Sequence, residues 1–419
     1  MESANTMTRD REESERNVTL PLVYFLGGYH PVNESFIRTP PSNVRLHSRV
    51  PVEAFNNFER VGEYASAWTQ SKNLADKTFA ILRMPRLVPV IGSFDLVHTN
   101  GSIIPLTLAP WIASVENPSA FYGFREGWHE RRSTRRRLAR YLLSRRCRAI
   151  LPYTEASKRY LMLSLDEWKS DIEQKTQILH PAIDEYLITA TEKSIDERFR
   201  EDHTVKFLFV GNHFFDKGGR EALRAFRHLR DKEKCELTIV SSAPSHQEKE
   251  FNELLPRLVK EPGVRFYRTG LPRARLMELY KGSDVFVFPS YMDQVPFVLL
   301  EAMAAGLPII GSNAFGIPEM ATEGENGFNI KSDILAFPEK GLRTEKHLEE
   351  YRRAVMDERN FDGVVEQLVD VMARIVRRPD LMIDMGKKSL SAVERGDFSV
   401  QTRNERLAGI YERSLDDRK

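Results

Sequence analysis

The second half of the chain alternates short runs of β-branched and aromatic residues with helical patterns, and this alternation constrains the fold more than any other feature. Such βα units are typical of a parallel sheet covered by helices. The expected strands lie at 206–210, 236–240, 264–267, 284–288, 308–311 and 327–330, and the expected helices at 220–229, 247–260, 273–280 and 296–305. We therefore expect a Rossmann-like domain from Val205 onward.

The first half follows the same pattern less regularly and predicts a second, looser Rossmann-like domain. Its apolar runs lie at 22–26, 95–98, 111–115, 149–152 and 177–179. A polar, highly charged stretch at 190–204 lacks a sustained apolar period and marks the boundary. A chain of 419 residues is also long enough for two hydrophobic cores.

These patterns give an expected division of the chain into four parts. A charged helical insertion is expected at 337–360, and residues 361–407 read as helical. The parts are a disordered N-terminus at 1–17, an N-terminal domain at 18–195, a C-terminal domain at 196–395 and a C-terminal helix at 396–419 that packs back on the N-terminal domain.

Composition is that of a protein that folds in water, with 41% apolar and 29% charged residues. No run of 18 apolar residues occurs, and the N-terminus is polar where a signal peptide needs an apolar centre, so we expect a cytoplasmic protein. The two cysteines, Cys147 and Cys235, have no C-x-x-C spacing and give little support for a zinc site or a disulfide. A net charge of +2 argues against a nucleic-acid binder.

One segment, Arg131 to Arg148, carries nine arginines. Leu138, Leu142 and Leu143 are spaced so that one side of a helix would be apolar. Two interpretations stay open: a solvated helix whose apolar seam packs against its own domain, and a peripheral surface that meets anionic lipid head groups or an acidic acceptor.

Two common nucleotide-binding signatures are missing, because the chain has neither G-x-x-x-x-G-K-[ST] nor G-x-G-x-x-G. No D-x-D is present either, so the carboxylate pair with which many sugar transferases hold a divalent metal has no candidate. We expect no cofactor and no metal, and a diphosphate would have to be bound without one.

A glycine-rich loop follows the first strand of the C-terminal domain, from Gly211 to Gly219. Glycines allow close backbone approach, and Lys217 offers a mobile ammonium that suits a phosphate. Taken alone this signal is weak, since such a loop is more often a plain turn.

The loop and helix after strand 284–288 are more specific. Pro296 suits a first helical turn, and the N–H groups of Phe297 and Val298 would then favour an anion. Asp293 and Glu301 stand eight residues apart across this helix start. A carboxylate on the otherwise apolar helix is costly unless something binds it, and a pair of sugar hydroxyls or a salt bridge would both serve.

With these residues in view, the chain resembles the retaining family-4 glycosyltransferases, which have the GT-B fold of two facing Rossmann-like domains. The resemblance runs from about residue 20 to residue 413. It is carried by segments 207–226, 284–312 and 316–328, and in the first domain by 94–102, 149–161 and 180–184.

The resemblance implies a role for each matching residue. Asp293 and Glu301 fall on the family's paired-acid motif, the first near the transferred sugar and the second on the ribose. Lys217 falls on the diphosphate lysine, and Gly27 and Gly28 on a glycine loop over the donor phosphates. The implied donor-binding residues are Gly27, Gly28, Gly211, Asn212, Lys217, Val295, Pro296, Phe297 and Glu301, and the implied catalytic residues are Asp293, Lys217 and Glu116.

The same resemblance implies the activity. A sugar would pass from a nucleotide diphosphate-sugar in the C-terminal domain to a glycan, lipid-linked or small-molecule acceptor on the N-terminal domain. The anomeric configuration would be kept, and the leaving diphosphate would help to deprotonate the acceptor.

The sequence departs from the family pattern at three positions. Asn212 stands where the family usually has arginine, Asp293 where it usually has glutamate, and Glu116 where it often has histidine. The first change removes a bidentate phosphate partner. A non-catalytic GT-B protein that binds a nucleotide or a partner protein is therefore the competing hypothesis, and a GT-B sugar-nucleotide epimerase fits the 284–312 motif less well.

Overall fold

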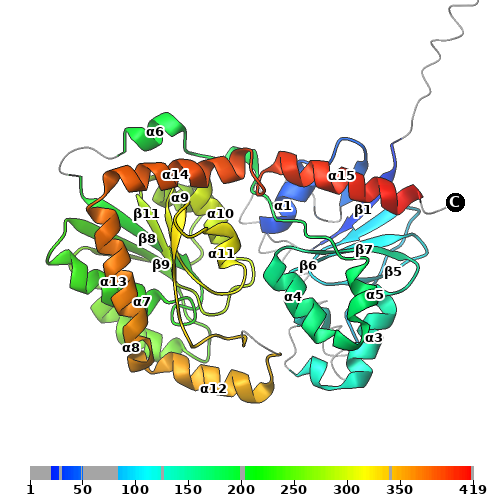
Figure 1. Ribbon diagram of the computed structural model, residues 1–419, viewed down its shortest axis with the longest axis horizontal. Helices are drawn as coiled ribbons and strands as arrows, with labels where there is room; N and C mark the ends of the chain where they lie inside the picture. The colour runs from blue at the N-terminus through cyan, green and yellow to red at the C-terminus, as the bar shows by residue number, and fades with distance from the viewer. Residues whose placement is uncertain are drawn as a thin grey trace, which may run out of the picture.

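The computed structural model describes residues 20–27, 31–48, 50, 84–123, 127–198, 203–338 and 342–416. They form two α/β domains that lie side by side, with the last two helices running along one edge of both (Figure 1). The expectation of two facing Rossmann-like domains is confirmed.

The N-terminal domain is built on a five-stranded sheet whose neighbouring strands all run parallel. Its order is β2 (Arg45–Ser48), β1 (Leu22–Leu26), β4 (Leu96–Thr99), β6 (Trp111–Val115) and β7 (Cys147–Pro152). A separate ribbon pairs β3 (Leu87–Pro89) with β5 (Ile104–Leu106). The helices are α1 (Pro31–Arg38), α3 (Arg132–Leu142), α4 (Glu155–Ser164) and α5 (Lys169–Glu173), and the short α6 (Glu192–Asp196) precedes the second domain.

The C-terminal domain is built on a six-stranded parallel sheet. Its order is β10 (Val264–Arg268), β9 (Cys235–Ser241), β8 (Val205–Gly211), β11 (Val285–Phe288), β12 (Ile309–Ser312) and β13 (Gly327–Ile330). Numbered within the domain this is the order 3-2-1-4-5-6 of dinucleotide-binding folds. The helices between the strands are α7 (Gly219–Arg230), α8 (Glu248–Val259), α9 (Arg273–Lys281), α10 (Phe297–Ala304) and α11 (Ile317–Met320).

The central strands explain why the sequence pattern was readable. Every residue of β11 is at most 1% exposed, because helices cover both faces of the sheet. A strand buried on both faces needs a continuous apolar run rather than an alternating one. The expected strands of this domain accordingly match the observed ones within one residue at each end.

Two expectations were wrong in detail. Residues 177–179 form no strand, and Thr176 makes only an isolated bridge to Ile150. The helical tail is broken twice, giving α13 (Asp362–Val376), α14 (Pro379–Glu394) and α15 (Val400–Asp416). The first break falls at Pro379, which has no N–H to continue a helix and stands in the first turn of the next one.

Helix α15 returns to the N-terminal domain and packs on α1 and β4. Arg403, only 1% exposed, donates to Ser35 Oγ at 2.6 Å and to the Thr39 carbonyl at 2.8 Å. Tyr411 Oη lies 2.8 Å from His98 Nδ1. Burial lowers the pKa of His98 to about 3, so this contact is between uncharged groups. The red helix beside α1 in Figure 1 shows the arrangement.

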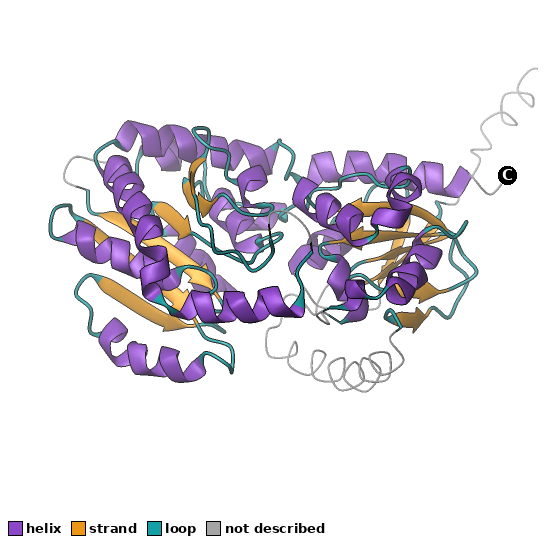
Figure 2. Ribbon diagram, turned by 60° about the horizontal axis from the view of Figure 1, so that its bottom comes forward, coloured by secondary structure: helices purple, strands orange, loops and turns teal. Residues whose placement is uncertain are grey.

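Helix α12 (Glu345–Met356) is the main element of the expected insertion at 337–360. It reaches from the C-terminal domain toward the N-terminal domain below the gap between them (Figure 1, Figure 2). Thr344 caps its start by accepting from the His347 N–H at 3.1 Å.

Candidate active site

The site is positioned by the strand order of the C-terminal domain. The order reverses between β8 and β11, so the connections that follow these two neighbours leave the sheet in opposite directions and open a crevice. The loop 211–218 follows β8, and the loop 289–296 follows β11. Ligands of open α/β sheets bind in such a crevice.

These two loops bring Lys217 and Asp293 into contact. Lys217 Nζ forms an ion pair with Asp293 Oδ1, and Ser290 Oγ donates to Asp293 Oδ2 at 2.7 Å. The lysine side chain is 13% exposed and that of the aspartate 19%. The pair is therefore accessible from one side, which suits a cation that neutralises a bound anion.

Gly218 lets the lysine loop approach β11 so closely. Its φ is +76°, and a Cβ at this position would lie 2.6 Å from the carbonyl oxygen of Pro289. Only glycine adopts this conformation without strain and leaves room for Pro289.

Glu116 approaches the same pair from the N-terminal domain. It follows β6, where that strand's carboxyl end faces the other domain. Burial, together with the negative charge of Asp293, raises the pKa of Glu116 to about 7, although Lys217 opposes the shift. The structure thus brings the three expected catalytic residues together from both domains, and Glu116 can hold a proton near neutral pH.

A cavity of about 330 Å³ lies between the domains at this point. Besides Glu116, Lys217 and Asp293 it is bounded by the segment leading into α12 and by α12 itself. Its other lining residues are Asn117, His213, Asp216, His246, Met292, Gln294, Ala336, Phe337, Arg343, Leu348, Tyr351 and Arg352.

Two lining residues offer polar groups that sequence reasoning missed. Gln294 is 5% exposed, and its Oε1 has no hydrogen-bond partner among the described residues. Arg343 is 8% exposed, and its guanidinium lies over the Phe337 ring, 4.0 Å from the ring centroid. Its charge also helps to lower the pKa of His129 in the other domain, although burial and Arg135 contribute more to that shift. Gln294 could have been noticed beside Asp293, whereas nothing in the sequence marks Arg343.

Asp216 is a third lining residue that the sequence did not indicate, and it connects the segments that surround the cavity. Its carboxylate accepts hydrogen bonds from Tyr351 Oη at 2.9 Å and from Gln247 Nε2 at 3.1 Å. These bonds and His213 lower its pKa, although burial acts in the opposite direction. Asp216 therefore ties the loop after β8 to α12 and to the loop after β9.

Glu301 lies on α10 outside the lining of this cavity, and it is 8% exposed. Tyr280 and Arg273 both lie close enough to act on its charge, and the Tyr280 hydroxyl donates to the Val298 carbonyl of α10 at 3.4 Å. Burial nevertheless raises the pKa of Glu301. Within the described residues Glu301 forms no ion pair, so the alternative of a salt bridge is not what the structure shows.

The start of α10 differs from the expectation by one residue. Pro296 is the residue before the helix rather than its first residue, and no side chain caps the first turn. The N–H groups of a first turn have no partner within the helix, and they make this end attractive to an anion. Val295, just before it, is 9% exposed.

The remaining donor-binding predictions fall on the glycine loops. Gly27 follows β1, and a Cβ there would lie 2.8 Å from Asn33 Nδ2 of α1, so a larger residue would require the Asn33 side chain to shift. Gly28 lies outside the described residues. Gly211 ends β8, and the exposed Asn212 next to it accepts a long hydrogen bond of 3.4 Å from Ser242. Gly27, Gly211 and Asn212 do not line the cavity described above.

The arginine-rich segment lies on the N-terminal domain and does not line the cavity. Leu138 and Leu142 of α3 are fully buried in the core of their own domain. Arg135 pairs with Asp166 at 2.5 Å and with Glu167 at 3.0 Å. The apolar seam is thus used internally, and contact of this segment with a membrane stays a prediction. No helix within the described ranges is both long and apolar enough to cross a bilayer.

Comparison with known proteins agrees with this geometry. Residues 191–353 match the family model for glycosyl transferases group 1. The two domains and the returning last helix define a GT-B protein. This match lies in the C-terminal domain, which is thus similar to the glycosyl transferases group 1.

Curated relatives match over part of the chain. An uncharacterized glycosyltransferase of Methanocaldococcus jannaschii is 27% identical over 182 residues, which are 41% of this chain and 45% of the relative. The D-inositol 3-phosphate glycosyltransferase of Corynebacterium glutamicum is 29% identical over 34% of this chain and 35% of the relative. Spore coat protein SA of Bacillus subtilis is 30% identical over 39% and 47%. The chain thus spans less than half the length of the curated relatives it matches.

Solved structures match over nearly the whole chain. Anabaena HepE in complex with UDP and glucose superposes with a TM-score of 0.59 at 12% identity, over 94% of this chain and 99% of that one. The lipopolysaccharide glycosyltransferase WaaG superposes with a TM-score of 0.53 at 17% identity, over 93% and 99%. At this identity the likeness establishes the fold.

Proposed function

We propose that this protein transfers a sugar from a nucleotide diphosphate-sugar to an acceptor held between its two domains, with retention of the anomeric configuration. The observation that carries the proposal is the contact between Lys217 and Asp293 at the switch point of the sheet, facing Glu116 across an interdomain cavity. The family of the C-terminal domain supports the reaction class.

Each group in this arrangement has a distinct task. Lys217 neutralises the charge that develops on the leaving diphosphate, and the first turn of α10 adds backbone N–H groups to the same end of the crevice. Asp293 orients the lysine and remains available to a hydroxyl of the transferred sugar. The unpaired Oε1 of Gln294 accepts a further hydroxyl.

Glu116 is suited to the acceptor side. A carboxyl group whose pKa is about 7 exchanges a proton near neutral pH, and it comes from the domain opposite the donor. In its protonated form it can donate a hydrogen bond to the oxygen of the acceptor hydroxyl, while the leaving diphosphate removes the proton of that hydroxyl. No step needs a metal.

Glu301 would bind the ribose by its carboxylate. Tyr280 and Arg273 lie beside this side chain, and Arg273 is itself held by its ion pair with Glu34. The raised pKa of Glu301 shows that burial disfavours the charge, and two ribose hydroxyls donating to the carboxylate would offset that cost.

The competing hypothesis is a GT-B protein that binds a nucleotide without transferring a sugar. Its support is the uncharged Asn212 in the glycine loop and the ion pair between Lys217 and Asp293. A diphosphate must compete with Asp293 for the lysine.

Release of nucleotide from a panel of UDP-, GDP- and ADP-sugars separates the two hypotheses. UDP-glucose is the first donor to test, because Anabaena HepE has been crystallised with it. Lys217→Ala should lower the release rate about 10²–10³-fold, the usual effect of removing one group that stabilises a developing anion. The control Lys249→Ala removes an exposed lysine of α8. Binding of a nucleotide without release, with acceptors present, would favour the non-catalytic hypothesis.

A further inference from the structure

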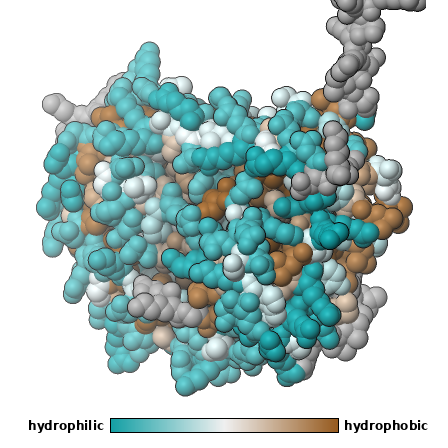
Figure 3. All heavy atoms as spheres, turned by 45° about the vertical axis from the view of Figure 1, so that its right-hand side comes forward, coloured by the Kyte–Doolittle hydropathy of each residue, from teal (hydrophilic) through white to brown (hydrophobic). Residues whose placement is uncertain are grey.

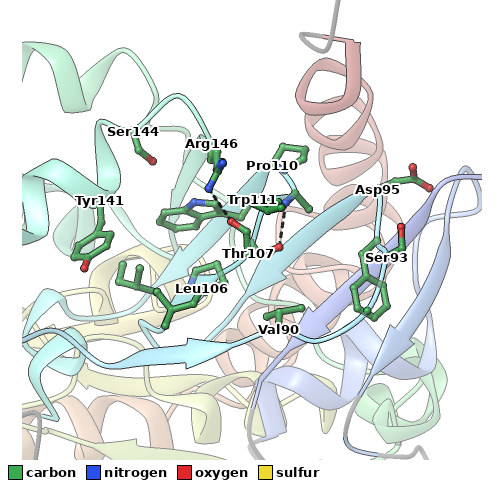
Figure 4. A pocket seen from close by; sticks show the side chains of 16 residues that line it. Val90, Ser93, Asp95, Leu106, Thr107, Pro110, Trp111, Tyr141, Ser144 and Arg146 are labelled. Atoms are coloured by element: carbon green, nitrogen blue, oxygen red, sulfur yellow. Dashed lines mark hydrogen bonds between the residues drawn. The ribbon is translucent and has the colours of Figure 1, made fainter.

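A hollow on the N-terminal domain, remote from the residues assigned to transfer, has an apolar rim. Its volume is about 910 Å³, and it lies between the β3–β5 ribbon and the end of α3. Figure 4 labels Val90 and Leu106 at the ribbon and Trp111 and Tyr141 among the other lining residues. The proposed transfer uses none of these groups.

Three aliphatic side chains on this rim are unusually exposed. Ile91 is 92% exposed, Leu108 84% and Leu106 47%. Ile91 and Leu108 lie in the loops after β3 and β5, and Leu106 is the last residue of β5. The ribbon holds these segments together, since the Val90 N–H donates to the Leu106 carbonyl at 3.1 Å. A single exposed aliphatic side chain needs no explanation. Three of them on adjoining segments around one hollow form an apolar patch, and such patches indicate an interaction site.

Arginines stand directly beside the aliphatic patch. Arg146 lines the hollow, and its Nη1 donates to the Thr107 carbonyl at 3.1 Å between the two exposed leucines. Arg145, which precedes it in the sequence, is exposed, and so is Arg140 of α3; neither forms an ion pair within the described residues. The one carboxylate in the lining, Asp95, accepts from the Leu22 N–H at 2.8 Å.

We infer that this patch, formed by Ile91, Leu106, Leu108, Arg145 and Arg146, docks the N-terminal domain on an anionic lipid surface. Aliphatic loop tips insert between acyl chains, and arginines at the same level meet the phosphates of the head groups. The surface differs from the α3 seam that the sequence suggested, because Leu138 and Leu142 are buried and only the arginine half of that segment remains on the surface.

The shape of the patch favours a lipid surface over a protein partner. A stable protein interface covers roughly 800 Å² per partner with a closely packed core. Here Ile91 and Leu108 project almost fully from loop tips, and the hollow between them is open rather than packed. The space-filling view shows apolar surface beside hydrophilic areas on this side of the molecule (Figure 3).

The test is co-sedimentation of the full chain with vesicles of phosphatidylcholine alone and of phosphatidylcholine with phosphatidylglycerol. We expect binding to the anionic vesicles that weakens as salt is raised, because the arginine contribution is screened. The double variant Ile91→Ser/Leu108→Ser and the double variant Arg145→Gln/Arg146→Gln should each lower the bound fraction at least about fivefold.

A matched control exists on the other domain. Val259 is 58% exposed on α8, and Arg257 on the same helix is exposed, so Val259→Ser/Arg257→Gln removes one aliphatic tip and one charge elsewhere. This variant should bind vesicles like the parent, and thermal melts of all three should show that they fold.

Three outcomes would overturn the inference: no binding of the parent to anionic vesicles, equal binding of the parent and the aliphatic variant, or a concentration-dependent dimer that the aliphatic variant abolishes while vesicle binding is absent. The last would assign the patch to a second copy of the chain. Vesicle binding does not depend on the proposed transfer, so the two proposals fail separately.

Discussion

Arg273 at the start of α9 forms an ion pair of 2.5 Å with Glu34 of α1 and so joins the two domains directly. The glutamate side chain is 1% exposed and also pairs with Arg38 at 2.9 Å. The charge of Arg273 acts on Glu301 as well, opposing the rise in its pKa. The position of one domain is thereby linked to the residue assigned to the ribose.

Arg273→Gln should lower the free energy of unfolding by about 1–3 kcal/mol, because a buried carboxylate loses one of its two cationic partners. The loss stays below that of a fully broken buried pair, since Arg38 remains. Chemical denaturation measures it. Arg275→Gln is the control: this exposed arginine pairs only along its own helix with Glu278, and its removal should change stability by less than about 0.5 kcal/mol.

Glu116 should make stability depend on pH. Its pKa rises from 4.5 to about 7 on folding, so between these values the folded state binds more protons than the unfolded state. The free energy of unfolding therefore falls as pH rises through this interval. In Glu116→Gln that contribution is absent, and the melting temperature should fall less between pH 5 and pH 8 than in the parent.

Melting curves of Glu248→Gln, an exposed glutamate on α8, give the reference for loss of one carboxylate elsewhere. Equal pH profiles for the parent and Glu116→Gln would mean that Glu116 does not carry the shift.

How much of the fold could be predicted depends on how each strand is buried. The C-terminal strands are covered on both faces and read as apolar runs, which is why β8 and β11 stood out. In the N-terminal domain β2 reads Arg-Leu-His-Ser and is half-exposed at the sheet edge, and β3 and β5 have three residues each. Such short edge strands carry no pattern long enough to recognise.

The candidate site divides in a similar way. Lys217 and Asp293 sit on local motifs, so a role for each could be inferred from the family that these motifs resemble. Asp216 lies inside the same glycine loop and passed unnoticed, because its role is to accept bonds from α12 and from the loop after β9. Arg343 and Tyr351 line the cavity because α12 packs over the crevice. The pattern of a charged helical insertion does not show against which part of the protein the helix packs.

Gly218→Ala tests the geometry of the lysine loop. With φ at +76° and Pro289 at 2.6 Å from an added Cβ, the substitution should cost at least about 1 kcal/mol of stability. It should also slow the release of nucleotide from the nucleotide-sugar donor, because Lys217 moves with the loop. Gly363→Ala is the matched control: it lies in α13 with no atom within 4 Å of the added Cβ, and should stabilise by about 0.5–1 kcal/mol. Similar effects from both would remove the special role of Gly218.

Tyr280→Phe tests the support of Glu301. Tyr280 is fully buried, and its hydroxyl lies close enough to Glu301 to oppose the rise of the pKa of that carboxyl group. The substitution should cost about 1–3 kcal/mol of stability and raise the pKa of Glu301 further. UDP binding is measured by calorimetry at a series of pH values. As pH is lowered, binding to the variant should begin to weaken at a higher pH than binding to the parent does. A UDP affinity unaffected by Glu301→Gln would place the ribose elsewhere.

Asn212→Arg tests where the diphosphate binds. Asn212 is exposed next to Gly211 at the end of β8, on the same loop as Lys217, and its side chain only accepts one long bond from Ser242. An arginine there would add a fixed positive charge and a fork that matches phosphate oxygens, and a gain of about 1.4 kcal/mol corresponds to tenfold tighter binding. Calorimetry with UDP measures it, and Gln401→Arg on the exposed side of α15 controls for one added charge. If both variants bind UDP equally, the glycine loop after β8 does not hold the diphosphate; a tighter Asn212→Arg that still releases no nucleotide from any donor would favour the non-catalytic hypothesis.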